Sequence, residues 1–247
     1  MKFMKRQRRT AILWLLDRLG VSTEVFHPYG VEVHVPKGSD LSMRYNLTRK
    51  VPYEVGEATL IRKYVTPGTH VIELGGCVGV ISALTRSVIG PEARQIVVEA
   101  EKALVPVCGA NAARGALPGA ALAVHAAVDY SGAPFVRFAT GHNAHVGHVA
   151  QPGEDGNDVP TTTLTRLMEG FPDDGPAALI CDIEGAELAL CHAEQAALAR
   201  FSVIVMELHP GVYPGGDRDQ AALESDLRAA GFTPVETIDQ VTCFVRA

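Results

Sequence analysis

The chain has 247 residues, enough for one large domain or two small ones with a sizeable core. Hydrophobic residues make up 47% of it and charged residues 20%, and the formal net charge is -6. This balance is typical of a soluble globular protein and excludes a broad basic surface that captures nucleic acid. The five cysteines form no Cys-x-x-Cys pair, and Cys181 and Cys243 lie in apolar runs, so we expect a reducing, cytoplasmic compartment.

The first predicted element is an amphipathic helix near residues 10–19, preceded by a basic stretch. The apolar run ends at Asp17 and Arg18, too early for a signal peptide and far short of a membrane span. We expect the helix to pack on the domain, with contact to a membrane or a partner as the alternative. The residues expected to pack are Ile12, Leu15, Leu16 and Leu19, and the basic residues are Lys2, Lys5, Arg6, Arg8 and Arg9.

Strands and helices then follow one another along the chain. Alternating valines predict a hairpin over residues 25–36, and helical spacing predicts a helix from Glu54 to Tyr64. Beyond it, strands alternate with helices, which indicates parallel βαβ units with helices on both faces of a sheet. The predicted strands are 70–74, 95–100, 122–128, 178–183 and 201–208, and the helices between them lie near 79–88, 101–114 and 185–199.

The chain ends in a predicted helix near 217–230 and two strands, 232–238 and 241–246. These strands are too close in sequence for a parallel crossover, so they must form an antiparallel hairpin. The expected fold is therefore α/β, a mostly parallel seven-stranded sheet with a C-terminal antiparallel hairpin. We divide the chain into an N-terminal extension of helix and hairpin, 1–52, and a main domain, 53–247.

An insertion at residues 129–176 interrupts this alternation. Residues 134–140 are predicted as a strand, and residues 141–160 are rich in Gly, His, Asn, Asp and Pro. The insertion can emerge at the carboxyl edge of the main strands, where loops carry ligands and specificity. Three histidines recur at every third residue, and we interpret the segment as a substrate loop, with metal binding as the alternative. They are His142, His145 and His148.

A glycine-dense turn follows the first strand of the main domain. Residues 70–79 read His-Val-Ile-Glu-Leu-Gly-Gly-Cys-Val-Gly, which predicts a strand, a tight turn and a helix start whose N–H groups face a ligand. A dinucleotide site needs Gly-x-Gly-x-x-Gly, but from Gly75 the third position is Cys77 and the last is Val80. The spacing is closer to a turn that binds S-adenosylmethionine, in which Glu73 can face the positively charged methionine part. An ordinary glycine-rich connection is the alternative.

Acidic residues and a histidine end the later strands. Glu99 lies about twenty residues beyond the turn, where a carboxylate can accept both hydroxyls of a ribose. Asp182 and Glu184 end the fourth strand on the same side, and capping of the next helix is the alternative role. Glu207 and His209 end the fifth strand with the same spacing. If these two strands are neighbours, the four groups face one crevice.

Several short stretches between residues 50 and 210 together form a pattern that is more specific than the glycine turn alone. They are Tyr53-Glu54 with Glu57, Pro67-Gly68, Glu73 to Gly79, Val98-Glu99, Thr163-Leu164, Cys181-Asp-Ile-Glu-Gly-Ala-Glu187 and Glu207-Leu-His209.

In these stretches the chain resembles the FkbM family of S-adenosylmethionine-dependent methyltransferases. The resemblance implies a class I, Rossmann-like fold and methyl transfer, usually to a hydroxyl oxygen of a sugar, polyketide or other secondary metabolite. The chain departs from the family at Cys77, where Asn is typical, and at Thr165 and Arg166, which replace an acidic pair.

The expected function is therefore O-methylation of a hydroxyl group on a small molecule or saccharide. His209 is the predicted base, because its ordinary pKa lies near neutral pH, with Asp182, Glu184 or Glu207 orienting it. Binding of Mg²⁺ or Mn²⁺ by these four residues is the rival mechanism, and the preferred site holds no metal. The residues expected to bind S-adenosylmethionine are Glu73, Gly75, Gly76, Cys77, Gly79, Glu99, Ala100, Ala127 and Asp182.

Two other functions stay open from the sequence. The chain could be a nucleotide-binding module or a degenerate methyltransferase that only binds a partner, as the Cys77 departure allows. A nucleic-acid methyltransferase would often carry Asn/Asp-Pro-Pro-aromatic after the fourth strand, where this chain has Asp182-Ile-Glu-Gly. We therefore expect no nucleic-acid partner.

Overall fold

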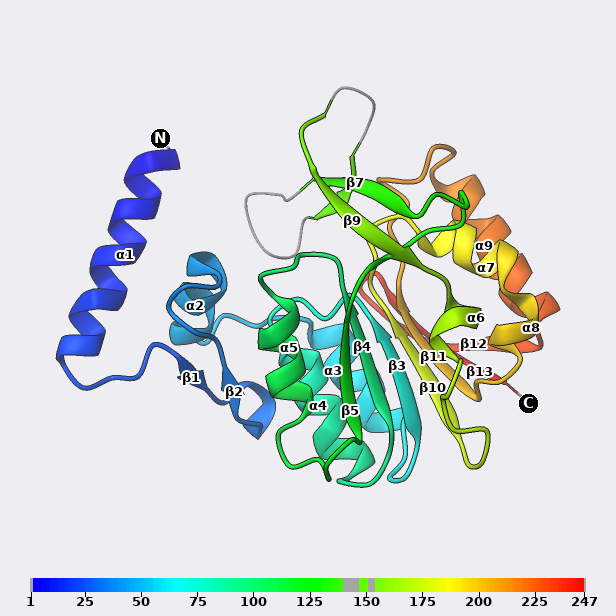
Figure 1. Cartoon of the computed structure of the whole chain (residues 1–247), viewed down its shortest axis with the longest axis horizontal. Coiled ribbons are helices and arrows are strands. Elements are labelled where there is room, and N and C mark those ends of the chain that lie inside the picture. The colour runs from blue at the N-terminus through cyan, green and yellow to red at the C-terminus, as the bar shows by residue number, and fades with distance from the viewer. Residues whose placement is uncertain (1, 140–146, 151–153, 247) are drawn as a thin grey trace.

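The computed structural model describes residues 2–139, 147–150 and 154–246. They form a central sheet flanked by helices, an N-terminal extension at one end, and a second, smaller sheet (Figure 1). The predicted α/β class is confirmed.

A seven-stranded sheet forms the centre of the main domain. Its strands are β3 (His70–Leu74), β4 (Gln95–Glu99), β5 (Ala121–His125), β10 (Ala177–Cys181), β11 (Val203–Glu207), β12 (Phe232–Ile238) and β13 (Val241–Arg246). They lie in the order β12-β13-β11-β10-β3-β4-β5. The strands from β11 to β5 run parallel, and β13 is antiparallel to both of its neighbours. This is a mostly parallel, Rossmann-like sheet with the predicted C-terminal antiparallel hairpin.

Helices cover both faces of this sheet, so a separate hydrophobic core lies on each side of it. They are α3 (Val55–Tyr64), α4 (Val80–Ile89), α5 (Val105–Ala112), α6 (Leu164–Leu167), α7 (Glu187–Ala193), α8 (Gln195–Leu198) and α9 (Asp217–Ala229). Side chains alternate along each strand, so Val71 packs with α3 and α4 while Ile72 packs with α6 to α9. Every residue of β4 and β10 is buried, because both of their faces are covered.

The order in which the chain adds strands to the sheet reverses between β3 and β10. From β3 the chain adds β4 and β5 on one side, and only later adds β10 and β11 on the other. In open α/β sheets such a reversal opens a crevice beyond the carboxyl ends of the two strands. The acidic strand ends singled out in the sequence all lie at this edge.

The N-terminal extension comprises α1 (Lys2–Arg18), β1 (Val25–Phe26), a 3-10 turn (Pro28–Gly30), β2 (Val33–His34) and α2 (Leu41–Thr48). The antiparallel pairing of β1 with β2 confirms the predicted hairpin.

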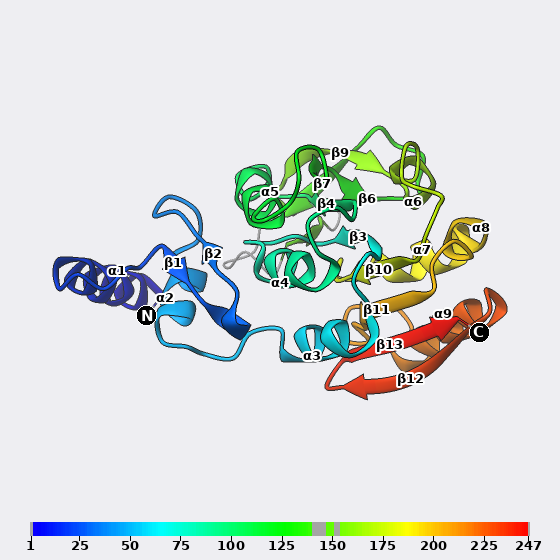
Figure 2. The same cartoon turned by 90° about the horizontal axis from the view of Figure 1, so that it is seen from below.

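The expectations for the first helix were partly wrong. It begins at Lys2 rather than near residue 10, and Leu15 and Leu19 are 52% and 68% exposed, whereas Leu13 is 3% exposed. The reason is that α1 packs on α2 at one end of the molecule, away from the central sheet (Figures 1 and 2). None of the described helices combines the length and apolar character needed to cross a membrane.

The insertion forms structure of its own. Its strands are β7 (Phe135–Ala139), β8 (His148–Val149) and β9 (Asn157–Thr162). They join β6 (Ala127–Val128), which directly precedes the insertion, in a four-stranded sheet in the order β6-β9-β7-β8. The predicted strand at 134–140 is confirmed, whereas 122–128 splits into β5 and β6, which belong to different sheets. Strand β9 went unpredicted because its sequence, Asn-Asp-Val-Pro-Thr-Thr, is mostly polar. His142 and His145 lie outside the described residues.

Candidate active site

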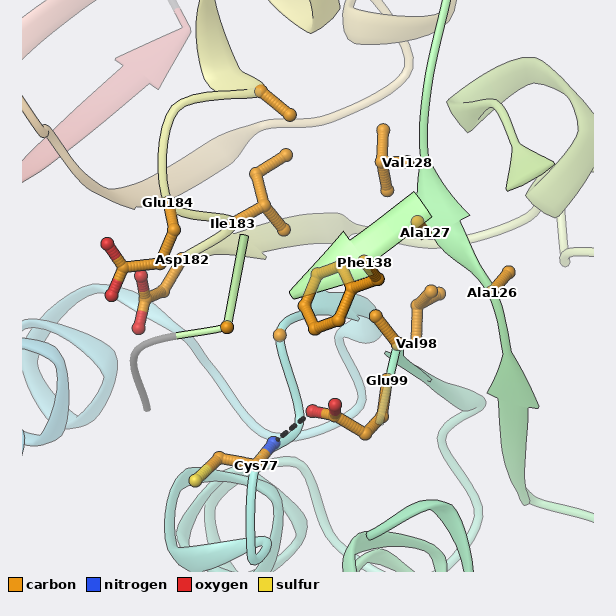
Figure 3. Close-up of a pocket in the computed structure, with 14 residues that line it drawn as sticks. Cys77, Val98, Glu99, Ala126, Ala127, Val128, Phe138, Asp182, Ile183 and Glu184 are labelled. Atoms are coloured by element: carbon orange, nitrogen blue, oxygen red, sulfur yellow. Dashed lines mark hydrogen bonds between the residues drawn. The ribbon is translucent and has the colours of Figure 1, made fainter. Parts of the chain in front are cut away.

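A cavity lies where the carboxyl ends of β3, β4 and β10 meet the insertion (Figure 3). About 660 Å³ of space lies between its walls, part of it open solvent. Asp182 and Glu184 lie side by side at one end, Glu99 lies at another, and Phe138 lies between them (Figure 3). The lining residues are Gly75, Cys77, Val98, Glu99, Ala100, Ala126, Ala127, Val128, Phe138, Gly147, Asp182, Ile183, Glu184 and Ala186.

The glycine turn brings β3 close to its neighbours. Gly75 has φ +93°, and a Cβ at this position would lie 1.9 Å from the Asp182 carbonyl oxygen. A Cβ on Gly76 would lie 2.5 Å from Val97, and one on Gly79 would lie 2.8 Å from Cys108. The last two glycines therefore serve packing against β4 and α5, and only Gly75 lines the cavity.

Cys77 occupies a conformation that Asn adopts more readily. Its φ is +45°, in the left-handed region where Asn is enriched among non-glycine residues. Burial, together with the nearby Glu54, raises the pKa of the Cys77 thiol well above its ordinary value. A thiol that stays protonated is a poor nucleophile, so Cys77 lines the cavity without competing for an electrophile.

Glu73 lies in the interior instead of facing the cavity. It is 1% exposed, and its carboxylate accepts hydrogen bonds from Ser82 Oγ at 2.6 Å and Gln95 Nε2 at 3.1 Å. Burial raises the pKa of Glu73 to about 7 despite these bonds. This placement differs from the expectation that Glu73 faces a ligand. The physical reason is strand alternation, which puts Glu73 on the same face as Val71, toward α4.

Glu99 lies at the cavity, as expected for the end of β4. Its Oε2 accepts the amide hydrogen of Cys77 at 2.7 Å, and its Oε1 accepts that of Glu101 at 2.6 Å. Burial raises the pKa of Glu99 to about 7, although both N–H groups stabilise the carboxylate. Ala100 and Ala127 line the same cavity.

The residues predicted as catalytic come together at the ends of β10 and β11. Nε2 of His209 lies 3.5 Å from Asp182 Oδ1 and 3.7 Å from both Glu184 Oε2 and Glu207 Oε1. His209 is 8% exposed. The strands are neighbours, so the condition for a shared crevice is met.

Glu187 positions His209, a role that the sequence analysis missed. Its Oε1 accepts a hydrogen bond from His209 Nδ1 at 3.1 Å, since a carboxylate can only accept. Its two oxygens also accept the amide hydrogens of Ile183 and Gly185. Tyr213 joins them, because its hydroxyl donates to Glu187 and accepts from the His209 amide. Glu187 closes the Asp-Ile-Glu-Gly-Ala-Glu run, which was the available signal.

The charge state of His209 differs from expectation. Burial alone would lower the pKa of His209, but the hydrogen bond with Glu187 and the surrounding carboxylates raise it to about 9. Burial and the neighbouring Glu207 raise the pKa of Asp182 to about 7. With these pKa values His209 is an imidazolium at neutral pH, and Asp182 is the group poised to exchange a proton.

Comparison with known proteins finds similar solved structures at low sequence identity. No family model and no curated protein matches the chain. A TehB-like S-adenosylmethionine-dependent methyltransferase from Corynebacterium glutamicum is 12% identical, with a TM-score of 0.44 and 83% of this chain and 96% of that chain covered. A precorrin-6y C5,15-methyltransferase from Geobacter metallireducens is 10% identical, with a TM-score of 0.43 and 79% and 90% covered.

A third solved structure, TrmN from Thermus thermophilus, is 13% identical with a TM-score of 0.42. The match covers 77% of this chain and 48% of TrmN, so the chain spans about half of that protein. All three scores lie below 0.5 and carry no information on what this chain binds.

The role of Glu187 can be tested by NMR titration of the histidine rings. We expect Glu187→Gln to lower the pKa of His209 by roughly one unit or more, because a hydrogen-bonded negative charge is removed from the imidazolium. His192 is an internal control, since its partner is Asp226, 3.4 Å away. The loss of one signal in His209→Gln assigns the resonance. An unchanged His209 pKa in folded Glu187→Gln protein would show that Glu187 does not hold the charge.

Proposed function

We propose that this chain is an S-adenosylmethionine-dependent methyltransferase that methylates a hydroxyl group of a small molecule or saccharide. One observation carries the proposal. The cavity at the strand reversal is lined by three carboxylates, Glu99, Asp182 and Glu184, and no Lys or Arg is among its described lining residues. Such a site favours a positively charged nucleoside over a dinucleotide, whose phosphates need N–H donors or cations.

We assign different lining residues to the ribose, the adenine and the sulfonium group of the cofactor. Glu99 retains acceptor capacity beyond its two N–H bonds, because each carboxylate oxygen has two lone-pair directions, and we assign it to the ribose hydroxyls. Phe138 and Val128 form the apolar wall assigned to the adenine. Gly75 and Asp182 are assigned to the sulfonium end, where a carboxylate attracts the positive charge. When bound, S-adenosylmethionine supplies the methyl group as an electrophile.

The chain's own contribution is to align the acceptor and remove its proton. Methyl transfer is an in-line displacement, so placement of the hydroxyl accounts for much of the acceleration. Asp182 and His209 are the proposed proton acceptor pair, with Glu187 orienting the ring. A cationic cofactor beside them lowers the pKa of both groups, which keeps Asp182 ionised and brings His209 toward neutrality.

The finer assignment to the FkbM family is part of the same proposal. Its support is that two of the matching stretches, 181–187 and 207–209, meet where His209 contacts Asp182 and Glu187. A cytoplasmic location is likewise proposed, since all five cysteines are free thiols. A module that binds a nucleoside without catalysis remains the alternative, and the following two experiments separate it from the enzyme.

Cofactor choice is tested by isothermal titration calorimetry with S-adenosylhomocysteine and NAD. We expect binding of the first and none of the second, because the site has carboxylates and lacks basic side chains. Glu99→Gln should weaken S-adenosylhomocysteine binding by about tenfold or more, the size of one charge-assisted hydrogen bond. Glu101→Gln is the matched control, because it keeps the backbone amide that donates to Glu99 and Glu101 lies outside the cavity lining. Tighter binding of NAD, or full affinity in Glu99→Gln, contradicts the assignment.

Catalysis is tested by release of S-adenosylhomocysteine over a panel of hydroxylated small molecules and saccharides. His209→Gln should lower turnover by about a hundredfold or more, the usual effect of losing proton transfer, while its affinity for S-adenosylhomocysteine stays nearly unchanged. His192→Gln removes an exposed histidine from α7 and should behave as the unchanged protein. Equal turnover in His209→Gln would reject the role of His209, and tight cofactor binding without turnover on any acceptor favours the binding module.

A further inference from the structure

Three carboxylates from three elements converge beside the cavity. Glu57 lies in the first turn of α3, Asp182 directly follows β10, and Glu207 ends β11. One oxygen atom of each lies within 4.8 Å of the other two. Asp182 also lines the cavity, whereas Glu57 and Glu207 are outside its lining.

These carboxylates have fewer partners than their burial requires. Glu57 is 4% exposed, and neither its Oε1 nor the buried Oδ1 of Asp182 has a hydrogen-bond partner. Among the described residues, the ion pairs of Asp182 and Glu207 both lead to His209, and Glu57 has no ion pair. Buried carboxylates without partners are strongly destabilising while they are charged, so a cation or a proton must neutralise them.

The surrounding chain balances only part of it. The N-terminus of α3 favours a negative charge at Glu57 but does not account for Asp182 or Glu207. His209 carries one positive charge, and its Nδ1 is already engaged by Glu187. Gln240 reaches Glu207 only through a long contact of 3.5 Å.

We propose that Glu57, Asp182 and Glu207 bind a divalent cation that prefers oxygen ligands, such as Mg²⁺, Mn²⁺ or Ca²⁺. Oxygen ligands on opposite sides of these ions lie about 4 to 5 Å apart, and the three carboxylate oxygens fall within that span. The side chain of Glu207 is 23% exposed, which leaves access for the ion and for water ligands. At this position the ion lies beside Asp182 and can polarise a hydroxyl group.

This site goes beyond methyl transfer and does not depend on it. Two other occupants would relieve the same repulsion. Glu57 and Glu207 could share a proton, or the cluster could hold the ammonium group of the bound cofactor. Only a metal site binds a divalent cation when the cofactor is absent, so the metal alone is the appropriate probe.

The test is a titration of the full chain with MnCl₂, without nucleosides, in which free Mn²⁺ is followed by electron paramagnetic resonance. We expect one saturable site per chain that Mg²⁺ or Ca²⁺ competes for. Glu57→Gln should weaken Mn²⁺ binding by about tenfold or more, since a charged ligand becomes neutral.

A second buried acid provides the matched control. Glu194 is 7% exposed, and its oxygens accept from the amide and hydroxyl of Thr165, contacts that glutamine can largely retain. Glu194→Gln should bind Mn²⁺ as the unchanged chain does. Without metal, Glu57→Gln should unfold at the same or a higher temperature, because burial and the neighbouring Glu207 already disfavour the charged form of Glu57. Loss of binding could then not be attributed to loss of folding.

Two results would overturn the proposal: no saturable Mn²⁺ binding by the unchanged chain, or equal binding by Glu57→Gln. If the unchanged chain binds no Mn²⁺ while Glu57→Gln weakens S-adenosylhomocysteine binding, the cluster holds the cofactor's ammonium group and the metal site is rejected. Failure of the methyltransferase proposal would leave Mn²⁺ binding intact, so the two proposals fail separately.

Discussion

The turn after β3 must pass within contact distance of the end of β10, and glycine at position 75 is what allows it. A side chain there would meet the Asp182 carbonyl at 1.9 Å, so any other residue would push the two strand ends apart. The close approach places the Asp182 carboxylate at the same cavity as Cys77 and Glu99. The site is thus a consequence of where the sheet reverses, and its chemistry comes from the residues that end each strand.

Electrostatics is the second organising feature. Four carboxylates surround the His209 imidazolium, those of Asp182, Glu184, Glu187 and Glu207, and burial raises the pKa of Glu99 and Asp182 to about 7. Repulsion between these carboxylates does not stabilise the fold. Such a cluster of acidic groups with raised pKa values is expected where a site binds a positively charged ligand. His209 is held in place by Glu187, which lies beneath it and is fully buried. Glu187 therefore both orients the His209 ring and favours its positive charge.

Sequence patterns predict the parts of the structure that depend on local periodicity. The sheet and its hairpin follow from the apolar runs of β3, β10 and β11 and from the short link before β13. The two-residue spacing in Asp182-Glu184 and Glu207-His209 predicts that those groups lie close together.

Contacts between elements that are far apart in sequence could not be predicted in this way. Glu57 joins the cluster because α3 packs on β11 and β13, and Glu187 meets His209 through the pairing of β10 with β11. Glu73 could have been placed correctly, because alternation from Val71 already directs it away from the cavity.

The central claim is that a cationic nucleoside lies on the turn after β3 with its sulfur facing Asp182 and His209. A crystal structure of the chain with S-adenosylhomocysteine tests this most directly. We expect ribose hydroxyls within hydrogen-bond distance of Glu99 and a sulfur atom between Gly75 and the carboxylate of Asp182. A ligand bound elsewhere, or a sulfur atom remote from both Asp182 and His209, would contradict it.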